Sequence, residues 1–233
     1  MRTFLIAVTA LLATWPLPAH SANRNYGVAG FTKIRVEGPY KVTVKTGVAP
    51  FAKASGSPAA LDRVQVDMRG DTLVVHSNSG AAWGGYPGAA SGPAEIFIGT
   101  HELSRASVTG AGTISIDRVE GLSFALSLQG SGAGEIGKVE SDQINVSLVG
   151  TASAKLGGRA RKMTALVRGV SALDSAAMTV PHAHISADGT ATVDANVTET
   201  ARVDSSGPAT IRLTGQPSCT LKVSGATTVS GCK

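Results

Sequence analysis

The nine residues LQGSGAGEI, 128 to 136, place three glycines, Gly130, Gly132 and Gly134, between apolar positions. Such a cluster suits either a loop that cradles phosphate or a turn in a repeated structure. A phosphate loop lies between a strand and a long helix, and one version ends in Lys followed by Ser or Thr. The segment GSGAGEI contains no lysine, and no helical pattern follows it. The rest of the chain therefore decides whether the motif is a repeated turn.

The motif does recur along the second half of the chain. Glycines stand 18 to 20 residues apart at seven positions: Gly110, Gly130, Gly150, Gly169, Gly189, Gly207 and Gly225. A small residue lies two positions after each glycine, and apolar residues lie four positions before each: Ala106, Leu126, Val146, Ala165, Ile185, Val203 and Leu221. The intervening odd positions are mostly polar. Alternation with a period of two indicates a strand with one buried face.

These repeats predict an all-β fold, a β-solenoid with one coil per repeat. A strand pair of this size cannot bury its apolar face alone, so neighbouring repeats must stack, with strands about 4.8 Å apart. We expect seven coils over residues 103–233, with Leu128, Leu148 and Val167 inside. The repeated glycines are then structural, because glycine tolerates positive φ and lets stacked corners approach closely.

Residues 23–102 also read as β-strands, which form either the first coils or a small sheet that covers the start of the solenoid. Arg69-Gly70-Asp71 is predicted to turn a hairpin. The glycine-rich segment 77–92 is predicted to be a surface loop. Its Trp83 and Tyr86 are candidate ligand contacts; the alternative is that the Trp83 ring folds back over an exposed coil edge.

The first 22 residues are typical of a secretory signal peptide. Arg2 precedes an apolar run from Phe4 to Leu12, and small residues follow, with cleavage expected after Ser21 or Ala22. No later segment has the apolar length of a membrane-spanning helix. We therefore expect an exported protein in the periplasm, on the outer surface or outside the cell. Outside the cytoplasm two cysteines usually pair, which predicts a Cys219–Cys232 disulfide.

The charge pattern argues against nucleic-acid binding. Beyond residue 22 the basic side chains exceed the acidic ones only slightly, and aromatic residues make up 4% of the chain. The only dense basic group is Arg159, Arg161, Lys162 and Arg168. A dedicated nucleic-acid binder carries a denser basic patch with aromatic residues between the charges.

Two sets of residues could carry chemistry. Asp174 and Asp194, each five positions after a glycine, would stack one coil apart like the carboxylate pair of a retaining glycosidase. Lys155 and Arg212 flank them, so a charge-compensated solvent face is the preferred interpretation.

His182 and His184 share an outward face, with Asp204 one coil away as a possible third metal ligand. Polar decoration of the strand is preferred there, because zinc sites use three or four protein ligands. We predict no metal and no cofactor.

The segments GFTKIRVEGPYKVTV, DTLVV, VTGAGTISI and LQGSGAGEI resemble the head GIN domain of putative auto-transporter adhesins. The resemblance covers about residues 27 to 230 and implies an exported bacterial domain built as a right-handed single-stranded parallel β-helix. It transfers no catalytic residues. The later segments GVSALDS and GTATVDA lack the second glycine of the pattern.

The preferred function is that of a non-enzymatic envelope or surface protein that binds a glycan or another protein. Two alternatives stay open. One is a polysaccharide-active enzyme that uses Asp174 and Asp194 as acid and base. The other is a structural unit that associates end to end, as a homo-oligomer, through its last coil.

Overall fold

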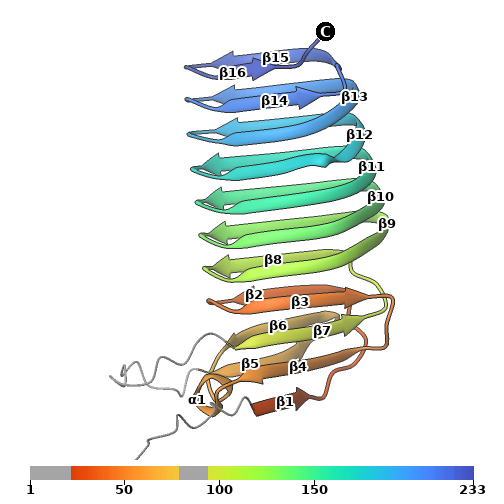
Figure 1. The fold of residues 1–233 in the computed structure, drawn as a ribbon, viewed down its shortest axis with the longest axis vertical. Coiled ribbons are helices and arrows are strands. Elements are labelled where there is room, and N and C mark those ends of the chain that lie inside the picture. Colours follow the sequence, from red (N-terminus) through yellow and green to blue (C-terminus); the bar gives the residue numbers. More distant parts are fainter. Residues whose placement is uncertain (1–21, 79–93) are drawn as a thin grey trace, which may run out of the picture.

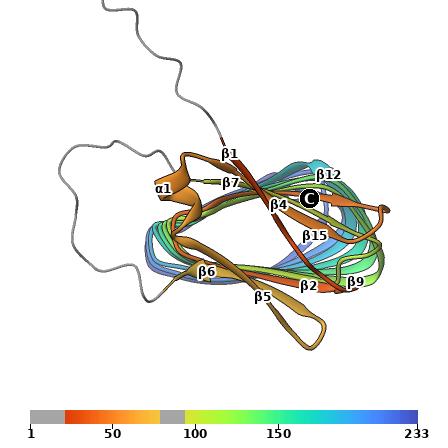
Figure 2. The ribbon, with the colours of Figure 1, turned by 90° about the horizontal axis from the view of Figure 1, so that it is seen from below.

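The computed structural model describes residues 22–78 and 94–233. They form a β-solenoid of about six turns, with successive turns lying on top of one another (Figure 1). Seen along its axis, the solenoid is a flattened oval whose two long faces meet at two corners (Figure 2). The predicted all-β solenoid is confirmed.

Five long strands build the middle of the stack, and each bends round a corner to run along both faces. They are β9 (Thr113–Gly130), β10 (Ala133–Gly150), β11 (Ser153–Gly169), β12 (Ala172–Asp188) and β13 (Thr192–Ser206). They pair in parallel, in a register that places Gly130 beside Gly150 and Leu128 beside Leu148. Above them, β14 (Thr210–Thr214) and β15 (Ser218–Ser224) pair with β13, and β16 (Thr228–Ser230) pairs with β14.

The seven repeated glycines form one column, which we call the glycine corner. All seven have positive φ, between 86° and 108°. Close stacking adds a second requirement, since a Cβ at Gly150 would lie 2.5 Å from the carbonyl oxygen of Gly130. Seven corners enclose six full turns, so the expected seven coils counted corners rather than the turns between them.

The side chains two and four positions before each glycine fill the interior. Leu128, Leu148 and Val167 have no exposed surface, as the alternation predicts. The pattern departs from burial in the last turn, where Leu221 is 47% exposed and Val223 is 40% exposed. No further turn of the described chain lies above these two residues, so their apolar side chains remain open to solvent.

Below β8 (Arg105–Gly110) the N-terminal region adds two layers. In the first, β2 (Lys33–Glu37) and β3 (Lys41–Thr46) pair in parallel with β8 and β9. Gly38 joins β2 to β3 with a φ of 115° and extends the glycine corner. In the second, β6 (Thr72–Ser77) and β7 (Glu95–Thr100) pair in parallel with β2 and β3.

Antiparallel strands and one short helix cover the N-terminal end. β4 (Phe51–Gly56) pairs with β7, β1 (Ala22–Tyr26) pairs with β4, and β5 (Val64–Arg69) pairs with β6. Gly70 turns the β5–β6 hairpin with a φ of 62°. The helix α1 (Pro58–Leu61) was not predicted from the sequence, although Ser57 caps it and a proline opens it.

At the other end, the predicted disulfide between Cys219 and Cys232 is confirmed, with an S–S distance of 2.03 Å. The backbone N–H of Lys233 donates to the carbonyl oxygen of Pro217 over 3.0 Å. This hydrogen bond and the disulfide together close the turn that β15 and β16 form.

Candidate functional site

The corner opposite the glycine corner is wider (Figure 2), and the regular pairing between turns is interrupted there. We define the wide corner as residues 117–123, 137–143, 157–162 and 176–182. The strands bend sharply here, and the pairing register shifts between Ile136 and Val139 and again between Lys155 and Gly157. On a flat strand, side chains alternate between the interior and the surface. At these bends, neighbouring side chains point outward instead.

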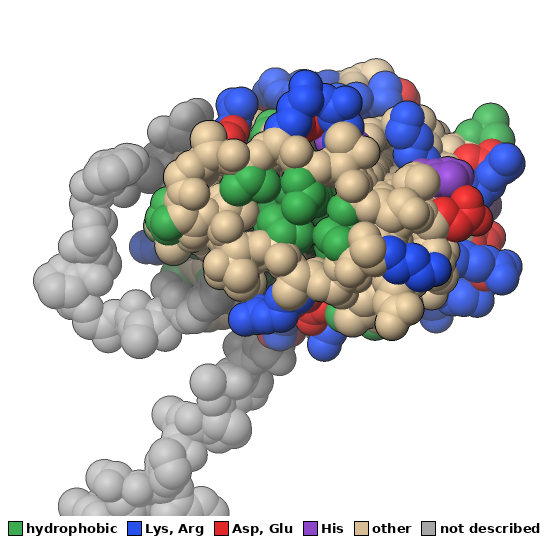
Figure 3. Space-filling view, turned by 90° about the horizontal axis from the view of Figure 1, so that it is seen from above, with side chains coloured by type: hydrophobic (Ala, Val, Ile, Leu, Met, Phe, Trp, Pro, Cys, Tyr) green, Lys and Arg blue, Asp and Glu red, His purple; other side chains and the backbone are tan. Residues whose placement is uncertain are grey.

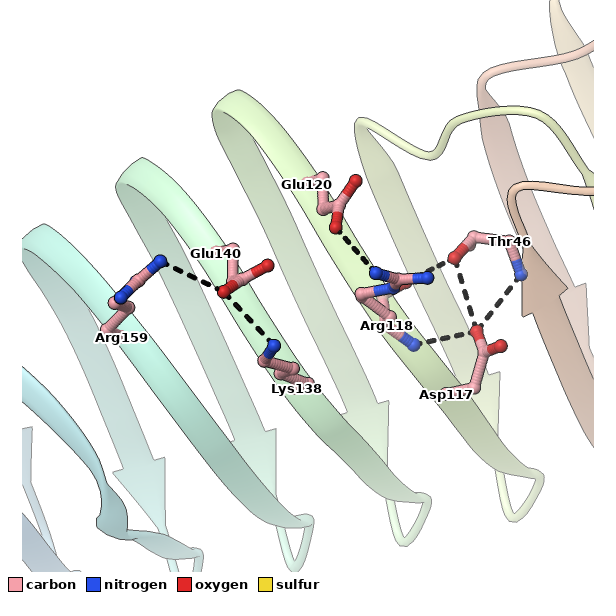
Figure 4. Close-up of polar contacts among 7 residues, drawn as sticks. All are labelled: Thr46, Asp117, Arg118, Glu120, Lys138, Glu140 and Arg159. Carbon is pink, nitrogen blue, oxygen red and sulfur yellow. Dashed lines mark hydrogen bonds and ion pairs between the residues drawn. The ribbon is translucent and has the colours of Figure 1, made fainter.

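A ladder of charged side chains climbs the wide corner from the N-terminal layers (Figure 4). At its foot, the Asp117 carboxylate accepts hydrogen bonds from the Thr46 backbone N–H at 3.0 Å and from the Arg118 backbone N–H at 2.7 Å. The Arg118 guanidinium then pairs with Glu120 at 2.9 Å. These contacts tie β9 to the end of β3.

One turn higher, Glu140 is shared by two cations. Its Oε1 lies 3.1 Å from Lys138 Nζ on the same strand and 3.1 Å from an Arg159 nitrogen on the next turn. Hydrogen bonding from Lys138, followed by the charges of Lys138 and Arg159, lowers the pKa of Glu140. Beside it, between the same two strands, Arg161 pairs with Asp142 at 3.5 Å. Ion pairs therefore join β10 to β11 at two places on the wide corner.

A shallow hollow of about 610 Å³ opens between these charged rungs, lined from four strands, β9 to β12. Leu122 lies on it and is 80% exposed. In the strand register, Leu122 takes the place that Asp142, Arg161 and Pro181 occupy in the next three turns. The hollow thus combines a protruding apolar side chain with two arginines, Arg159 and Arg161, whose side chains are 77% and 81% exposed.

A second, smaller groove of about 480 Å³ lies on the face formed by β3 and β9 to β12. Small side chains line much of it, among them Thr113, Ala133 and Ser153. Asp174 also lines it, and the register places Asp174 beside Asp194, as the sequence predicted. Asp194, however, is held by Arg212 at 3.1 Å and does not line the groove. The structure brings the two carboxylates together without placing both in one cleft.

The predicted histidine group divides into two. His184 Nε2 lies 2.8 Å from the Asp204 carboxylate, which Arg202 also contacts at 2.9 Å. Hydrogen bonding from Arg202 and then from His184 lowers the pKa of Asp204. His182 instead lies 2.9 Å from the Thr200 hydroxyl and 3.6 Å from Glu199. Across the part of the chain that the structure describes, no group of His, Cys, Asp and Glu is arranged to hold a metal ion.

Two of the sequence candidates, Trp83 and Tyr86, lie outside the described residues, as does most of the expected signal segment. Conversely, the sequence analysis missed Leu122. Leu122 stands two positions before the buried Phe124, in phase with the buried residues of the strand, so alternation alone places it inside, whereas it is 80% exposed. Within 22–78 and 94–233, no helix has the length and hydropathy needed to cross a membrane.

Comparison with known proteins agrees with this architecture. Residues 30–217 match the family model described as putative auto-transporter adhesin, head GIN domain. No curated protein is similar enough to the chain to count as a match.

Several solved structures share the fold. A putative adhesin from Bacteroides fragilis superposes with a TM-score of 0.79 at 20% identity, covering 90% of this chain and 96% of that one. A putative lipid binding protein from Parabacteroides distasonis gives 0.70 at 15% identity, covering 91% and 96%. A putative adhesin from Parabacteroides merdae gives 0.68 at 14% identity, again covering 91% and 96%.

Proposed function

Because the chain belongs to the family of putative auto-transporter adhesins with a head GIN domain, we propose that it is an exported, non-enzymatic surface protein that binds a partner protein at the wide corner. The family and two of the three solved neighbours named above are described as putative adhesins, which supports a surface-binding role, and the third as a putative lipid binding protein.

One observation carries the binding site, namely the exposure of Leu122 beside arginines in a hollow that spans four strands. A leucine that protrudes from a surface gains about 1.5–3 kcal/mol when a partner covers it. Arginine is enriched at the energetic centres of protein interfaces, where its planar head contacts both apolar and acidic groups. The hollow therefore offers an apolar anchor, Leu122, beside the arginine side chains that protein interfaces favour.

The same features favour a protein over a glycan. Sugars are often recognised by a flat aromatic ring together with hydroxyl and carboxylate groups, and the described lining of this hollow contains no aromatic side chain. Its rim also alternates charge, Glu140 and Asp142 against Arg159 and Arg161, which matches a segment carrying charges of both signs.

Rigidity supports a binding role rather than a catalytic one. The backbone of the wide corner is held by the parallel pairing of β9 to β12, so the surface is formed before a partner binds, which lowers the entropic cost of binding. A glycosidase of the retaining type would need both carboxylates free to face a substrate. Asp194 is instead neutralised by Arg212.

Export is supported by the sequence at the first described strand. β1 begins at Ala22, next to the two cleavage positions expected from the sequence, and pairs with β4 from its first residue. The Cys219–Cys232 disulfide fits an oxidising compartment.

The experiment is a cell-binding assay with fluorescently labelled chain lacking residues 1–22, on a panel of bacterial and mammalian cells. We expect Leu122→Ser and Arg161→Ser each to weaken binding, Leu122→Ser roughly ten- to hundredfold from the lost apolar burial. Val170→Ser is the matched control, because Val170 is 64% exposed but lies at the glycine corner. Pretreating the cells with protease should abolish binding, whereas periodate oxidation of glycans should leave it intact.

Loss of binding after periodate but not after protease would replace the protein partner with a glycan. Equal effects of Leu122→Ser and Val170→Ser would remove the wide corner as the site. No saturable binding to any cell type would overturn the adhesin-like function itself.

A further inference from the structure

The end of the solenoid formed by β15 and β16 is open. Among the described strands, β15 pairs on one side only, with β13, and β16 on one side only, with β14. The other edge of each strand therefore presents backbone N–H and C=O groups without a strand partner. Viewed onto this end, apolar side chains gather at the centre and are ringed mainly by uncharged groups (Figure 3).

The apolar groups of this end include Leu221 and Val223 of β15, Val229 of β16 and the Cys219–Cys232 disulfide. Leu221 stacks on Val203 in the turn below, and Val203 has no exposed surface, whereas Leu221 is 47% exposed. The columns that form the core therefore continue to the open end. An unpaired strand edge above an open core is a template for pairing with another strand.

The opposite end of the molecule lacks these features. β1 carries polar residues at its centre, Asn23, Arg24 and Asn25, and crosses the oval at an angle (Figure 2). The helix α1 lies beside it and contributes to the cover. A second copy of the chain therefore finds its best match for the open end in another open end rather than in β1. Such a contact is isologous, and it closes with two copies.

We propose that two copies of this chain associate through their open ends, with β15 of one copy paired antiparallel to β15 of the other. The seven residues of β15 are centred on Leu221, which would lie opposite itself on the two-fold axis. Cys219 would then face Val223 across the pair, with both on the interior side. Thr220 would face Lys222 on the outer side, so no two like charges of β15 lie opposite each other.

The same two-fold axis also relates the two copies of β16, on the other long face of the solenoid. Leu221 lies four positions before the last corner glycine, Gly225, and Val229 lies four positions after it. Residues placed symmetrically about a corner face one another across the flattened interior. An axis through Leu221 therefore continues through Val229, and it would align β16 with its copy, with Thr228 opposite Ser230. Both faces of the solenoid would continue across the contact with one symmetry operation.

Sedimentation velocity of the chain lacking residues 1–22, over a hundredfold concentration range, tests the proposal. We expect the mass to rise from one chain to two and then to stop, because the N-terminal ends do not pair. Leu221→Lys places two lysines opposite each other on the axis and should return the protein to a single chain. Val170→Lys, an exposed apolar position at the glycine corner, should leave the association unchanged.

Two further variants test the register. Thr220→Glu puts a carboxylate opposite Lys222 of the other copy and should tighten the association several-fold, whereas Thr220→Lys should weaken it. Leu221→Cys should form a disulfide-linked pair under mild oxidation, and Val170→Cys should not. Circular dichroism of each variant at low concentration shows whether the single chain is still folded.

A mass of one chain at every concentration would overturn the proposal, as would association that Leu221→Lys leaves intact. A mass that grows past two chains would also overturn it, since an isologous contact cannot extend. These outcomes are independent of the wide corner, because Leu122→Ser and Arg161→Ser should not change the sedimentation of the protein.

Discussion

Gly110 packs directly on Gly38, although strands β3 to β7 lie between them in the sequence. A Cβ at Gly110 would lie 3.5 Å from both the Cα and the nitrogen of Gly38. The contact joins β2 and β3 to the regular repeats as one further layer with the same corner. The column of glycines is therefore longer than the run of regular repeats.

This column gives a first prediction, made with two glycine-to-alanine variants. Gly150→Ala suffers both a positive φ of 108° and a Cβ placed 2.5 Å from the Gly130 carbonyl oxygen. Gly47→Ala also has a positive φ, 72°, but its Cβ would meet nothing within 4 Å. We expect Gly47→Ala to cost about 1–2 kcal/mol of unfolding free energy from backbone strain alone, and Gly150→Ala clearly more. Urea unfolding measures both, and equal losses would contradict the close-stacking account.

Gly38 also shows where the repeat could not be recognised from the sequence. The apolar positions around it follow the rule, with Ile34 and Val36 before it and Val42 after it. The position two residues on, however, holds Tyr40 instead of a small residue, and its hydroxyl reaches out to contact Ser77 at 2.9 Å. The capping strands inserted after β3 also interrupt the regular spacing. Periodicity therefore finds the middle of the solenoid and loses its first layers.

A second prediction compares two residues of β9 at the wide corner, one buried and one exposed. Phe124 is fully buried, and truncating it to alanine should cost about 3–5 kcal/mol, the usual range for deleting a buried aromatic ring. Leu122, two residues earlier, is 80% exposed, and Leu122→Ala should change the unfolding free energy by less than about 0.5 kcal/mol. A comparable loss in both variants would mean that Leu122 is covered within the single chain.

Leu122 also explains why the candidate site was not predicted from the sequence. Alternation identifies residues on flat strands, but the wide corner bends, and its register shifts from turn to turn. At the same level of the corner, successive turns carry leucine, aspartate, arginine and proline. Because these four stacked residues share no size, charge or polarity, the sequence repeat does not reveal that they lie together. The hollow can be recognised only in the folded structure.

A third prediction concerns the disulfide. Cys219 and Cys232 are separated by 13 positions, and closing a loop of this size stabilises a protein by about 3 kcal/mol on a chain-entropy estimate. Because each turn contacts only its neighbours, the loss should concentrate in the last turn. We expect Cys219→Ser/Cys232→Ser to raise amide hydrogen exchange in β15 and β16 far more than in β9 to β11. Uniformly faster exchange along the whole stack would contradict that local role.

The final prediction is a loss of stability in acid. Hydrogen bonding from Ser206 and Arg168 lowers the pKa of Asp188 below its usual 3.8, and Arg202 and His184 lower that of Asp204. A carboxyl group whose pKa is lower in the folded state stabilises that state at pH values above its unfolded pKa. This contribution is lost as the pH falls through the folded value. The unfolding free energy should therefore hold steady from neutral pH to about pH 5 and decrease below about pH 4.

Asp188→Asn and Asp204→Asn should each lower stability at neutral pH and flatten the acid limb of the curve. Both groups are close to solvent, so added salt should shrink the difference between variant and wild type by screening the pairs. Urea unfolding at a series of pH values measures these effects. An acid limb of unchanged slope in the double variant would show that other carboxyl groups, such as Glu140 on the wide corner, carry the pH dependence, because the pKa of Glu140 is lowered in the same direction.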